Sequence, residues 1–447
     1  MTTYAQYKTR PLDCWQRAKE LRLKHYKSVA TAHQDGKLLV TGSGASFISV
    51  LAGFGDDIVF LCGEPYGASI SIDLPFHEAC AEETEARGFA RDLCAYLRSY
   101  WGSMFLNRYY FGGPFPKPDF CFYIHFCDSH AKWYQIVKEH FGVPYFGVDL
   151  PIGPHRSFPQ KVNYVVGQLH DAIEGIEKFL GRKFDDEKFL KAVRNEFRVT
   201  AFWPKICELN KNIPAPLDQK SLFSLYVLAM LERYNPESVQ FYSDLYAEVK
   251  DRVANGIAAL ATERCRVIDD SQPPWHFLKI YRIMEKYGAI SVGSPYCFGL
   301  MGVWDETDDG QLVARKTPEE KGEEPRTREE ALRTLATWYL LRDEGPSSML
   351  GFYLPDIKNR VLPLVVKNWK AQGVLMHLNR GCEGTAFGQM ENRLALIKAG
   401  IPVMTYEGNM ADEKEFDERR TTSRIESFME TLGLEQIPGA VAAQAAS

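Results

Sequence analysis

The chain has 447 residues, 45% of them hydrophobic and 25% charged. It is longer than the chains that a single hydrophobic core usually supports, so we expect two or three domains. Its formal net charge of −5 provides no basic field for nucleic acid, which we exclude as a partner. Residues 1–15 lack an apolar core region, and the most apolar internal run, residues 222–231, is too short to span a bilayer. We therefore expect a cytoplasmic protein that does not bind membranes.

The first third of the chain alternates predicted strands with predicted helices. Short apolar runs predict strands at residues 37–40, 58–62, 120–125 and 144–148, and helical spacing predicts helices over residues 74–101 and 128–141. Such alternation is typical of a parallel α/β sheet. We assign residues 1–157 to an N-terminal α/β domain.

Helical periodicity dominates from about residue 160 to residue 263. An inward-facing stripe is predicted for Phe179, Phe189, Val193 and Phe197. We assign residues 158–272 to a mainly helical segment.

Strand signals then return, with a helix predicted over residues 275–287 and strands at 289–292, 374–378 and 402–406. Residues 273–436 are therefore assigned to a C-terminal α/β domain, and residues 437–447 to a disordered tail. The expected fold class is α/β, with two parallel-sheet domains that face a cleft and a helical segment between them.

Two of the ten cysteines follow predicted strands. Cys127 lies between the strand at 120–125 and a helix, and Cys382 lies between the strand at 374–378 and a helical run that contains Phe387, Met390, Leu394 and Ile397. In open α/β sheets ligands bind beyond the carboxyl ends of strands, and helix N-termini there favour anionic groups such as a thiolate-ligated cluster. Cys94, on a predicted helix, offers a third thiol. The spacing itself matches neither a ferredoxin nor a zinc ribbon, and any single cysteine can equally be a small buried hydrophobe.

Polar residues near these strand ends are candidates for substrate contacts. The run from Gly42 to Ser46 resembles a dinucleotide fingerprint that lacks its third glycine, so we favour a role without phosphate in which Ser43 and Ser46 line a substrate crevice. His125, two residues before Cys127, is the candidate proton donor, with His130 as the alternative. A histidine bonded to backbone at a strand end is the competing interpretation.

Several segments resemble the 2-hydroxyglutaryl-CoA dehydratase D-component superfamily, and the similarity spans nearly the whole chain. It is carried by residues 125–133 (HFCDSHAKW), 142–144 (GVP), 379–384 (NRGCEG), 400–403 (GIPV) and 422–430 (TSRIESFME). Within that superfamily, similarity to the larger cluster-bearing subunit of ATP-dependent benzoyl-CoA reductases is carried by residues 64–68 (EPYGA), 116–120 (PKPDF) and 406–412 (YEGNMAD).

The resemblance implies a 4Fe-4S cluster held by Cys94, Cys127 and Cys382, with one iron left open and Cys80 as the rival of Cys94. It further implies ATP-driven, ferredoxin-dependent reduction of benzoyl-CoA to a cyclic dienoyl-CoA. The implied partners are a smaller homologous cluster-bearing subunit, an ATP-hydrolysing activator, ferredoxin as electron donor and the acyl-CoA substrate. A separate activator agrees with the lack of a GxxxxGK[ST] loop in this chain.

Two alternatives stay open. One is a subunit of a 2-hydroxyacyl-CoA dehydratase that acts through a ketyl radical, since both reactions begin with one-electron reduction of a thioester. The other is a non-catalytic electron-relay or structural subunit.

Overall fold

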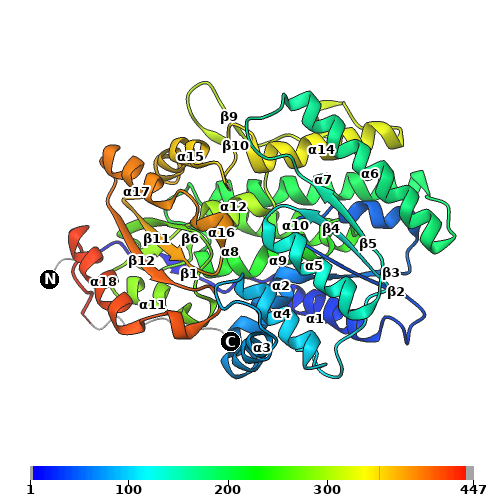
Figure 1. The fold of residues 1–447 in the computed structure, drawn as a ribbon. Coiled ribbons are helices and arrows are strands. Elements are labelled where there is room, and N and C mark those ends of the chain that lie inside the picture. The colour runs from blue at the N-terminus through cyan, green and yellow to red at the C-terminus, as the bar shows by residue number, and fades with distance from the viewer. Residues whose placement is uncertain (1–3, 352, 439–447) are drawn as a thin grey trace.

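The computed structural model describes residues 4–351 and 353–438, and its two main β-sheets are each built from four parallel strands (Figure 1). The α/β fold class is therefore confirmed. No helix among the described residues is long and apolar enough to cross a membrane. From residue 439 onwards, the tail predicted to be disordered lies outside the described residues.

The N-terminal sheet has the strand order β3-β2-β4-β5. Its strands are β2 (Leu38–Gly42), β3 (Ile58–Cys62), β4 (Phe120–His125) and β5 (Tyr145–Asp149). Its flanking elements are α1 (Trp15–Thr31), the 3-10 helix η1 (Ile48–Phe54), α2 (Gly63–Ile72), α3 (Leu74–Ala86), α4 (Ala95–Phe105) and α5 (Asp128–Phe141). The bounds of β3, β4 and α5 agree with the sequence prediction to the residue.

Alternation along β4 distributes helices over the two faces of this sheet. Tyr123 stacks on Tyr134 of α5, with ring centroids 5.0 Å apart, whereas Phe120 meets Phe179 of α6 (Phe158–Leu180) at 5.8 Å. Residues an odd number apart on a strand point to opposite faces. Both faces of β4 are thus covered, which explains its continuous apolar sequence.

The helix predicted over residues 74–101 is two helices, α3 and α4. The break lies near Gly88, whose φ of +86° is a left-handed conformation that favours glycine and ends helices. Cys94 is consequently the N-cap residue of α4 and does not lie within a helix, which corrects the sequence prediction.

Long helices connect and support the two sheets. They are α6, α7 (Asp186–Leu209), α8 (Gln219–Leu225), α9 (Val227–Glu232) and α10 (Pro236–Ala254), and α14 (Arg328–Glu344) packs against α6 and α7. Three members of the predicted inward stripe, Phe189, Val193 and Phe197, are buried, but Phe179 near the end of α6 is 46% exposed.

The C-terminal sheet has the order β12-β11-β7-β8. Its strands are β7 (Cys265–Asp270), β8 (Ala289–Ser291), β11 (Gly373–Asn379) and β12 (Val403–Gly408). Strand β7 lies inside the segment 158–272 that we predicted to be mainly helical. Its charged residues interrupt the apolar pattern, yet they are buried in ion pairs, such as Asp270 with Lys358 at 2.8 Å. The second sheet therefore begins before the predicted boundary at residue 272.

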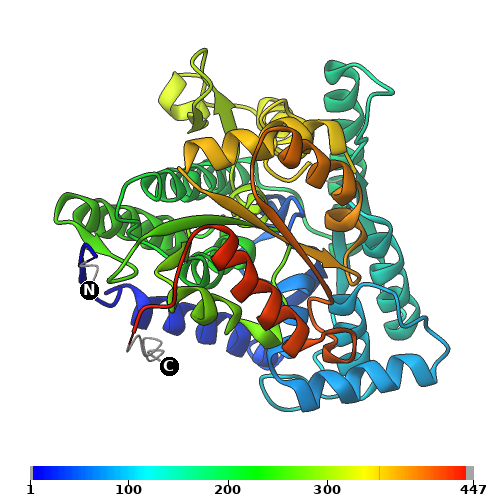
Figure 2. The same cartoon turned by 90° about the vertical axis from the view of Figure 1, so that its left-hand side faces the viewer.

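Helices cover both faces of this second sheet (Figure 2). One face carries α11 (Ile280–Glu285) and α18 (Glu418–Thr431), and the other carries α15 (Pro355–Asn368) and α17 (Gln389–Lys398). The helix predicted over residues 275–287 is the 3-10 helix η2 (Trp275–Phe277) followed by α11. The remaining elements are β1 (Lys8–Thr9), β6 (Ile257–Ala258), α12 (Pro295–Leu300), β9 (Trp304–Glu306), β10 (Leu312–Ala314), α13 (Pro318–Lys321), α16 (Glu383–Ala386) and the 3-10 helix η3 (Glu413–Glu415).

Candidate functional site

Three cysteines from distant parts of the chain line one pocket between the two sheets. Cys94, Cys127 and Cys382 each immediately precede a helix, as the N-cap residues of α4, α5 and α16. Strand β4 leads to Cys127 and strand β11 leads to Cys382. The structure thus brings together the three thiols that were predicted to share a site.

The strand order of the sheets explains why the pocket forms there. In the N-terminal sheet β2 lies between β3 and β4, and in the C-terminal sheet β7 lies between β8 and β11. The order in which the chain adds strands therefore reverses between β2 and β4, and again between β7 and β11. The crevice beyond the carboxyl ends at such a switch point is the usual ligand site of an open α/β sheet. Residues after β4, β7 and β11 all line the pocket.

Buried sulfur atoms in the pocket contact hydrogen-bond donors. Burial raises the pKa of Cys94 well above its usual value, and the nearby Cys382 adds to this rise. Backbone amides of Tyr96 and Leu97 donate to the Cys94 sulfur and act in the opposite direction, because they stabilise the thiolate. Burial likewise raises the pKa of Cys382, whereas the hydrogen bonds from Thr385 and Gln272 lower it.

The amide of Gln272 is held in a single orientation beside Cys382. Its Nε2 donates to Cys382 Sγ at 3.2 Å, while its Oε1 accepts from Asn379 Nδ2 at 3.0 Å and from Thr385 Oγ1 at 2.8 Å. Because Oε1 is fixed as the acceptor, Nε2 must face the sulfur. Gln272 was not predicted as a site residue because β7, which ends two residues earlier, was not predicted as a strand.

A carboxylate and an imidazole line the same pocket. His130 Nε2 lies 2.8 Å from Glu64 Oε1, and Glu64 Oε2 accepts the backbone N–H of Gly44 at 2.8 Å. Burial alone would lower the pKa of His130, but the charges of Cys127 and Glu64 raise it well above its usual value. Glu64 had not been predicted as a site residue, although its place directly after β3, in the first turn of α2, is a usable signal.

His125 lies at the end of β4 but is not among the residues that line the pocket. Its Nδ1 bonds Asp149 Oδ1 at 2.7 Å, and its side chain is 38% exposed. Its catalytic role therefore stays a prediction, and His130 is the histidine that faces the thiols.

Ser43 and Ser46 are fully buried behind the pocket wall. Their Oγ atoms lie 2.9 Å apart, and Ser46 Oγ accepts the N–H of Ile124 at 3.2 Å. Ala45, between them, lines the pocket. Their role in substrate binding stays a prediction.

The glycine that precedes these serines has a packing role. A Cβ atom on Gly42 would lie 1.9 Å from the carbonyl oxygen of Phe122, so β2 and β4 can approach here only if residue 42 is glycine. This close approach accounts for Gly42 without a bound nucleotide.

The remaining cysteines lie outside the pocket. Cys80 is fully buried in α3 against Gly102 of α4, and burial raises its pKa to about 12. The others are Cys14, Cys62, Cys121, Cys207, Cys265 and Cys297, and all except Cys14 are buried.

Three thiols that line one pocket are ligands of the kind that an iron-sulfur cluster uses. Within residues 4–351 and 353–438 no three His, Cys, Asp or Glu side chains are close enough to share one metal ion. An iron-sulfur cubane carries its irons at separate corners, so its thiolates surround a space and need not meet at a point. Three thiols around one pocket, with amide donors beside the sulfurs, fit this requirement.

The family model described as 2-hydroxyglutaryl-CoA dehydratase, D-component, matches residues 69–432. The chain belongs to this family. It is 23% identical over 357 residues to the (R)-phenyllactyl-CoA dehydratase alpha subunit of Clostridium sporogenes, covering 78% of this chain and 79% of that protein.

Further relatives of this chain include the (R)-2-hydroxyisocaproyl-CoA dehydratase alpha subunit of Clostridioides difficile, which is 24% identical over 84% of this chain and 86% of its own length. A benzoyl-CoA reductase subunit of Thauera aromatica is 22% identical over 78% of this chain and 79% of its own length. The match to the D-component family contains all three pocket cysteines and His130, and it begins after Ser43, Ser46 and Glu64.

Proposed function

We propose that this D-component chain is the 4Fe-4S subunit of an enzyme complex that reduces an acyl-CoA thioester, with Cys94, Cys127 and Cys382 as the cluster ligands. The observation that carries the proposal is the meeting of these three thiols in one pocket at the switch points of two sheets. When bound, such a cluster supplies single electrons at low potential. The relatives' names as dehydratase and reductase subunits support a reaction on an acyl-CoA.

Benzoyl-CoA is the substrate we favour. Tyr96, Phe126, Trp133 and Tyr296 line the pocket, and aromatic walls suit a flat aromatic ring. The reaction adds two electrons and two protons to the ring and yields a cyclic dienoyl-CoA, with ferredoxin as electron donor and ATP hydrolysed by a separate activator. Dehydration of a 2-hydroxyacyl-CoA is the second candidate, favoured by the dehydratase alpha subunits among the relatives.

His130 and Glu64 form the pair that we assign to proton transfer in this pocket. Glu64 orients the imidazole ring of His130 through Nε2, at 2.8 Å, and a carboxylate in that position stabilises a proton on the ring. We prefer His130 to His125 because only His130 lines the pocket. Proton transfer by a placed side chain contributes about 10²- to 10⁴-fold to a rate.

We also infer that the chain functions with a partner subunit, a homologous cluster-bearing chain, and that α17 contacts it. Met390, Leu394 and Ile397 lie at helical spacing on α17, Phe387 precedes the helix, and each of the four is between 47% and 59% exposed. A contiguous exposed apolar stripe on a globular protein marks an interaction surface. Helix α17 begins seven residues after Cys382, so a partner there is close to the pocket.

The test is anaerobic co-expression with the partner and activator subunits, followed by assay of benzoyl-CoA and of a 2-hydroxyacyl-CoA. We expect ATP-dependent formation of a dienoyl-CoA from benzoyl-CoA. Loss of water from the 2-hydroxyacyl-CoA, without dienoyl-CoA formation, would replace the first candidate by the second. An assembled complex whose activity survives replacement of all three pocket cysteines would reject a catalytic cluster in this chain.

A further inference from the structure

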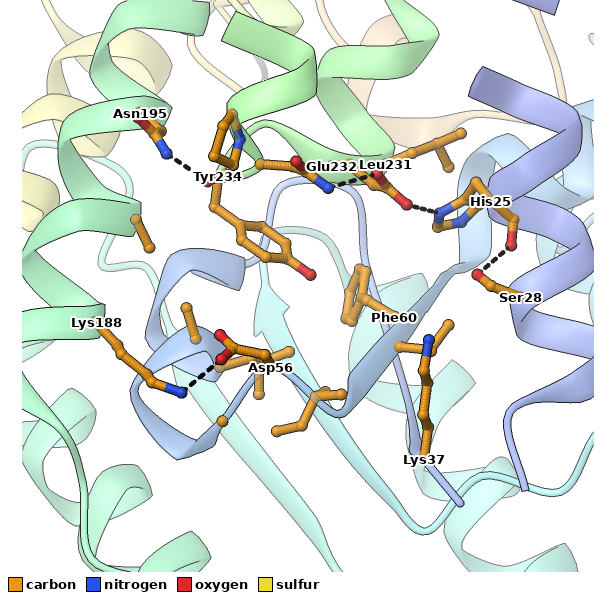
Figure 3. Close-up of a pocket in the computed structure, with 18 of the residues that line it drawn as sticks. His25, Ser28, Lys37, Asp56, Phe60, Lys188, Asn195, Leu231, Glu232 and Tyr234 are labelled. Carbon is orange, nitrogen blue, oxygen red and sulfur yellow. Dashed lines mark hydrogen bonds and ion pairs between the residues drawn. The ribbon is translucent and has the colours of Figure 1, made fainter. Parts of the chain in front are cut away.

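A second cavity, of about 530 Å³, lies beside β3, the edge strand of the N-terminal sheet (Figure 3). Its walls come from α1, η1, β3, α7 and the turn between α9 and α10. It shares no lining residue with the cysteine pocket. Its size is within the range of small-molecule sites, and nothing in the proposed reaction uses it.

The charges around this cavity are mainly positive, although the whole chain carries a net charge of −5. Four lysines line it, Lys24, Lys37, Lys188 and Lys191, against the two carboxylates of Asp56 and Glu232, and Lys24 is paired with Glu237 at 2.5 Å. Lys188 is paired with Asp56 at 2.6 Å, and Glu232 accepts from His25 Nδ1 at 2.8 Å, so both carboxylates are occupied.

Several donors at the cavity lack an acceptor. Among the described residues, no side chain forms an ion pair or hydrogen bond with the ammonium groups of Lys37 and Lys191 or with the hydroxyl of Tyr234. Burial raises the pKa of Tyr234, so its hydroxyl keeps its proton and remains a donor. His25 is 2% exposed, and its buried Nε2, which is the acceptor nitrogen of the neutral ring when Nδ1 donates to Glu232, also has no partner within the part of the chain that the structure describes. Lys37 and Tyr234 are only partly buried, so these two donors face the space of the cavity without an acceptor from a side chain.

The positions of these groups indicate which ligand would be complementary to the cavity. The Tyr234 hydroxyl and the Lys37 ammonium both point into the cavity, on either side of Phe60 (Figure 3). The floor is apolar and is formed by Leu51, Ala52, Ile58, Val59 and Phe60. The complementary ligand therefore has an anionic group and an apolar body.

We propose that this cavity binds a small organic anion with an aromatic or branched apolar body, such as a carboxylate, between Lys37 and Tyr234 and against Phe60. The wall that separates it from the cysteine pocket is α9, where Met230 lines the cysteine pocket and Leu231 lines this cavity. The site is thus distinct from the thiols, and it does not depend on the proposed reaction.

The test is calorimetric titration of the full chain, purified anaerobically, with three probes. Benzoate has both the charge and the apolar ring, benzamide is its neutral analogue, and acetate has the charge alone. We expect saturable binding of benzoate, with benzamide and acetate each about tenfold weaker or more, since a hydrogen bond to a charged group is worth about that factor.

Two variants locate the binding, and a third controls for charge. Lys37→Met should weaken benzoate binding about tenfold and leave benzamide unchanged, and Tyr234→Phe, which keeps the ring, should weaken benzoate by a smaller factor. Lys178→Met, on the exposed surface of α6, should have no effect. Equal benzoate affinity in Lys37→Met and Lys178→Met, or benzamide binding as tightly as benzoate, would overturn the proposal.

Discussion

At the scale of single residues, the pocket is defined by what contacts each sulfur. Cys94 receives two backbone amides and Cys382 receives the Gln272 side chain, whereas Cys80 packs against Gly102 of α4. Hydrogen bonds to sulfur stabilise negative charge, so these contacts suit thiolate ligands. Cys62 also receives a backbone amide, from Glu64, so it is the position in the pocket that separates the three proposed ligands from the other cysteines.

Replacing any of the three pocket cysteines by serine should lower the iron content of the anaerobically purified chain. Cys80→Ser is the matched control and should keep its iron, because Cys80 is buried outside the pocket. Iron and acid-labile sulfide analysis measures both. If Cys80→Ser lost its iron and Cys94→Ser retained it, Cys80 would take the place of Cys94 in the ligand set.

Removing the Gln272 amide should change the potential of a bound cluster and leave its iron in place. A donor to sulfur favours the more negative, reduced state, so Gln272→Leu should lower the midpoint potential. A redox titration followed by electron paramagnetic resonance measures it. If the midpoint potential did not change at full iron content, Gln272 would not stabilise the charge of a cluster ligand at Cys382.

The two histidines near Cys127 can be separated by kinetics. His130→Gln should slow substrate turnover by about 10²- to 10⁴-fold with iron content intact, because it removes the proton donor in the pocket. His125→Ala removes the pairs with Asp149 and Asp128, which lie outside the residues that line the pocket, and should slow turnover far less. The reverse order of effects would restore His125 as the proton donor.

At the scale of elements, the sequence predicted those whose pattern is local. Strand β4 and helix α5 are continuous in apolar or amphipathic residues, and the place of Cys127 between them followed directly. Strand β7 was missed because Arg266 and Asp270 resemble surface residues, and the buried partner of Asp270 lies far along the chain. The convergence of Cys94 with the other thiols depends on tertiary packing, so only the family resemblance could suggest it.

Helix α17 was predicted from its sequence, but its apolar residues Met390, Leu394 and Ile397 are not buried as their spacing suggests. In the single chain these three residues of the helix are exposed. If a partner subunit covers it, Leu394→Glu should weaken the complex about tenfold or more, because a charge would be buried at the contact. Leu23→Glu, at a site on α1 that is 53% exposed, is the matched control and should assemble normally. Analytical ultracentrifugation of the co-expressed subunits measures both, and equal assembly of the two variants would remove α17 from the interface.

At the scale of the whole molecule, two sheets of the same strand order contribute to one pocket. Each sheet alone has a switch-point crevice, but Cys127 and Cys382 belong to different sheets. The pocket therefore exists only while the sheets and the helices between them hold their relative positions.

One buried network maintains that arrangement. Arg233, which follows α9, bonds Glu196 of α7 at 2.8 Å, the Tyr339 hydroxyl of α14 at 2.6 Å and the carbonyl oxygen of Gly44 after β2 at 3.0 Å. All three side chains are almost fully buried. The network thus ties three helices to the loop beside the pocket.

Removing the carboxylate from this network should be far more costly than removing a hydroxyl. Glu196→Ala leaves the Arg233 guanidinium buried without its counter-charge, which costs about 3–5 kcal/mol, whereas Tyr339→Phe removes hydrogen bonds worth about 1 kcal/mol each. Thermal unfolding followed by circular dichroism should therefore give a much lower midpoint for Glu196→Ala than for Tyr339→Phe. Equal midpoints would mean that water or another acceptor replaces Glu196, and that the helices are held to the pocket loop by apolar packing alone.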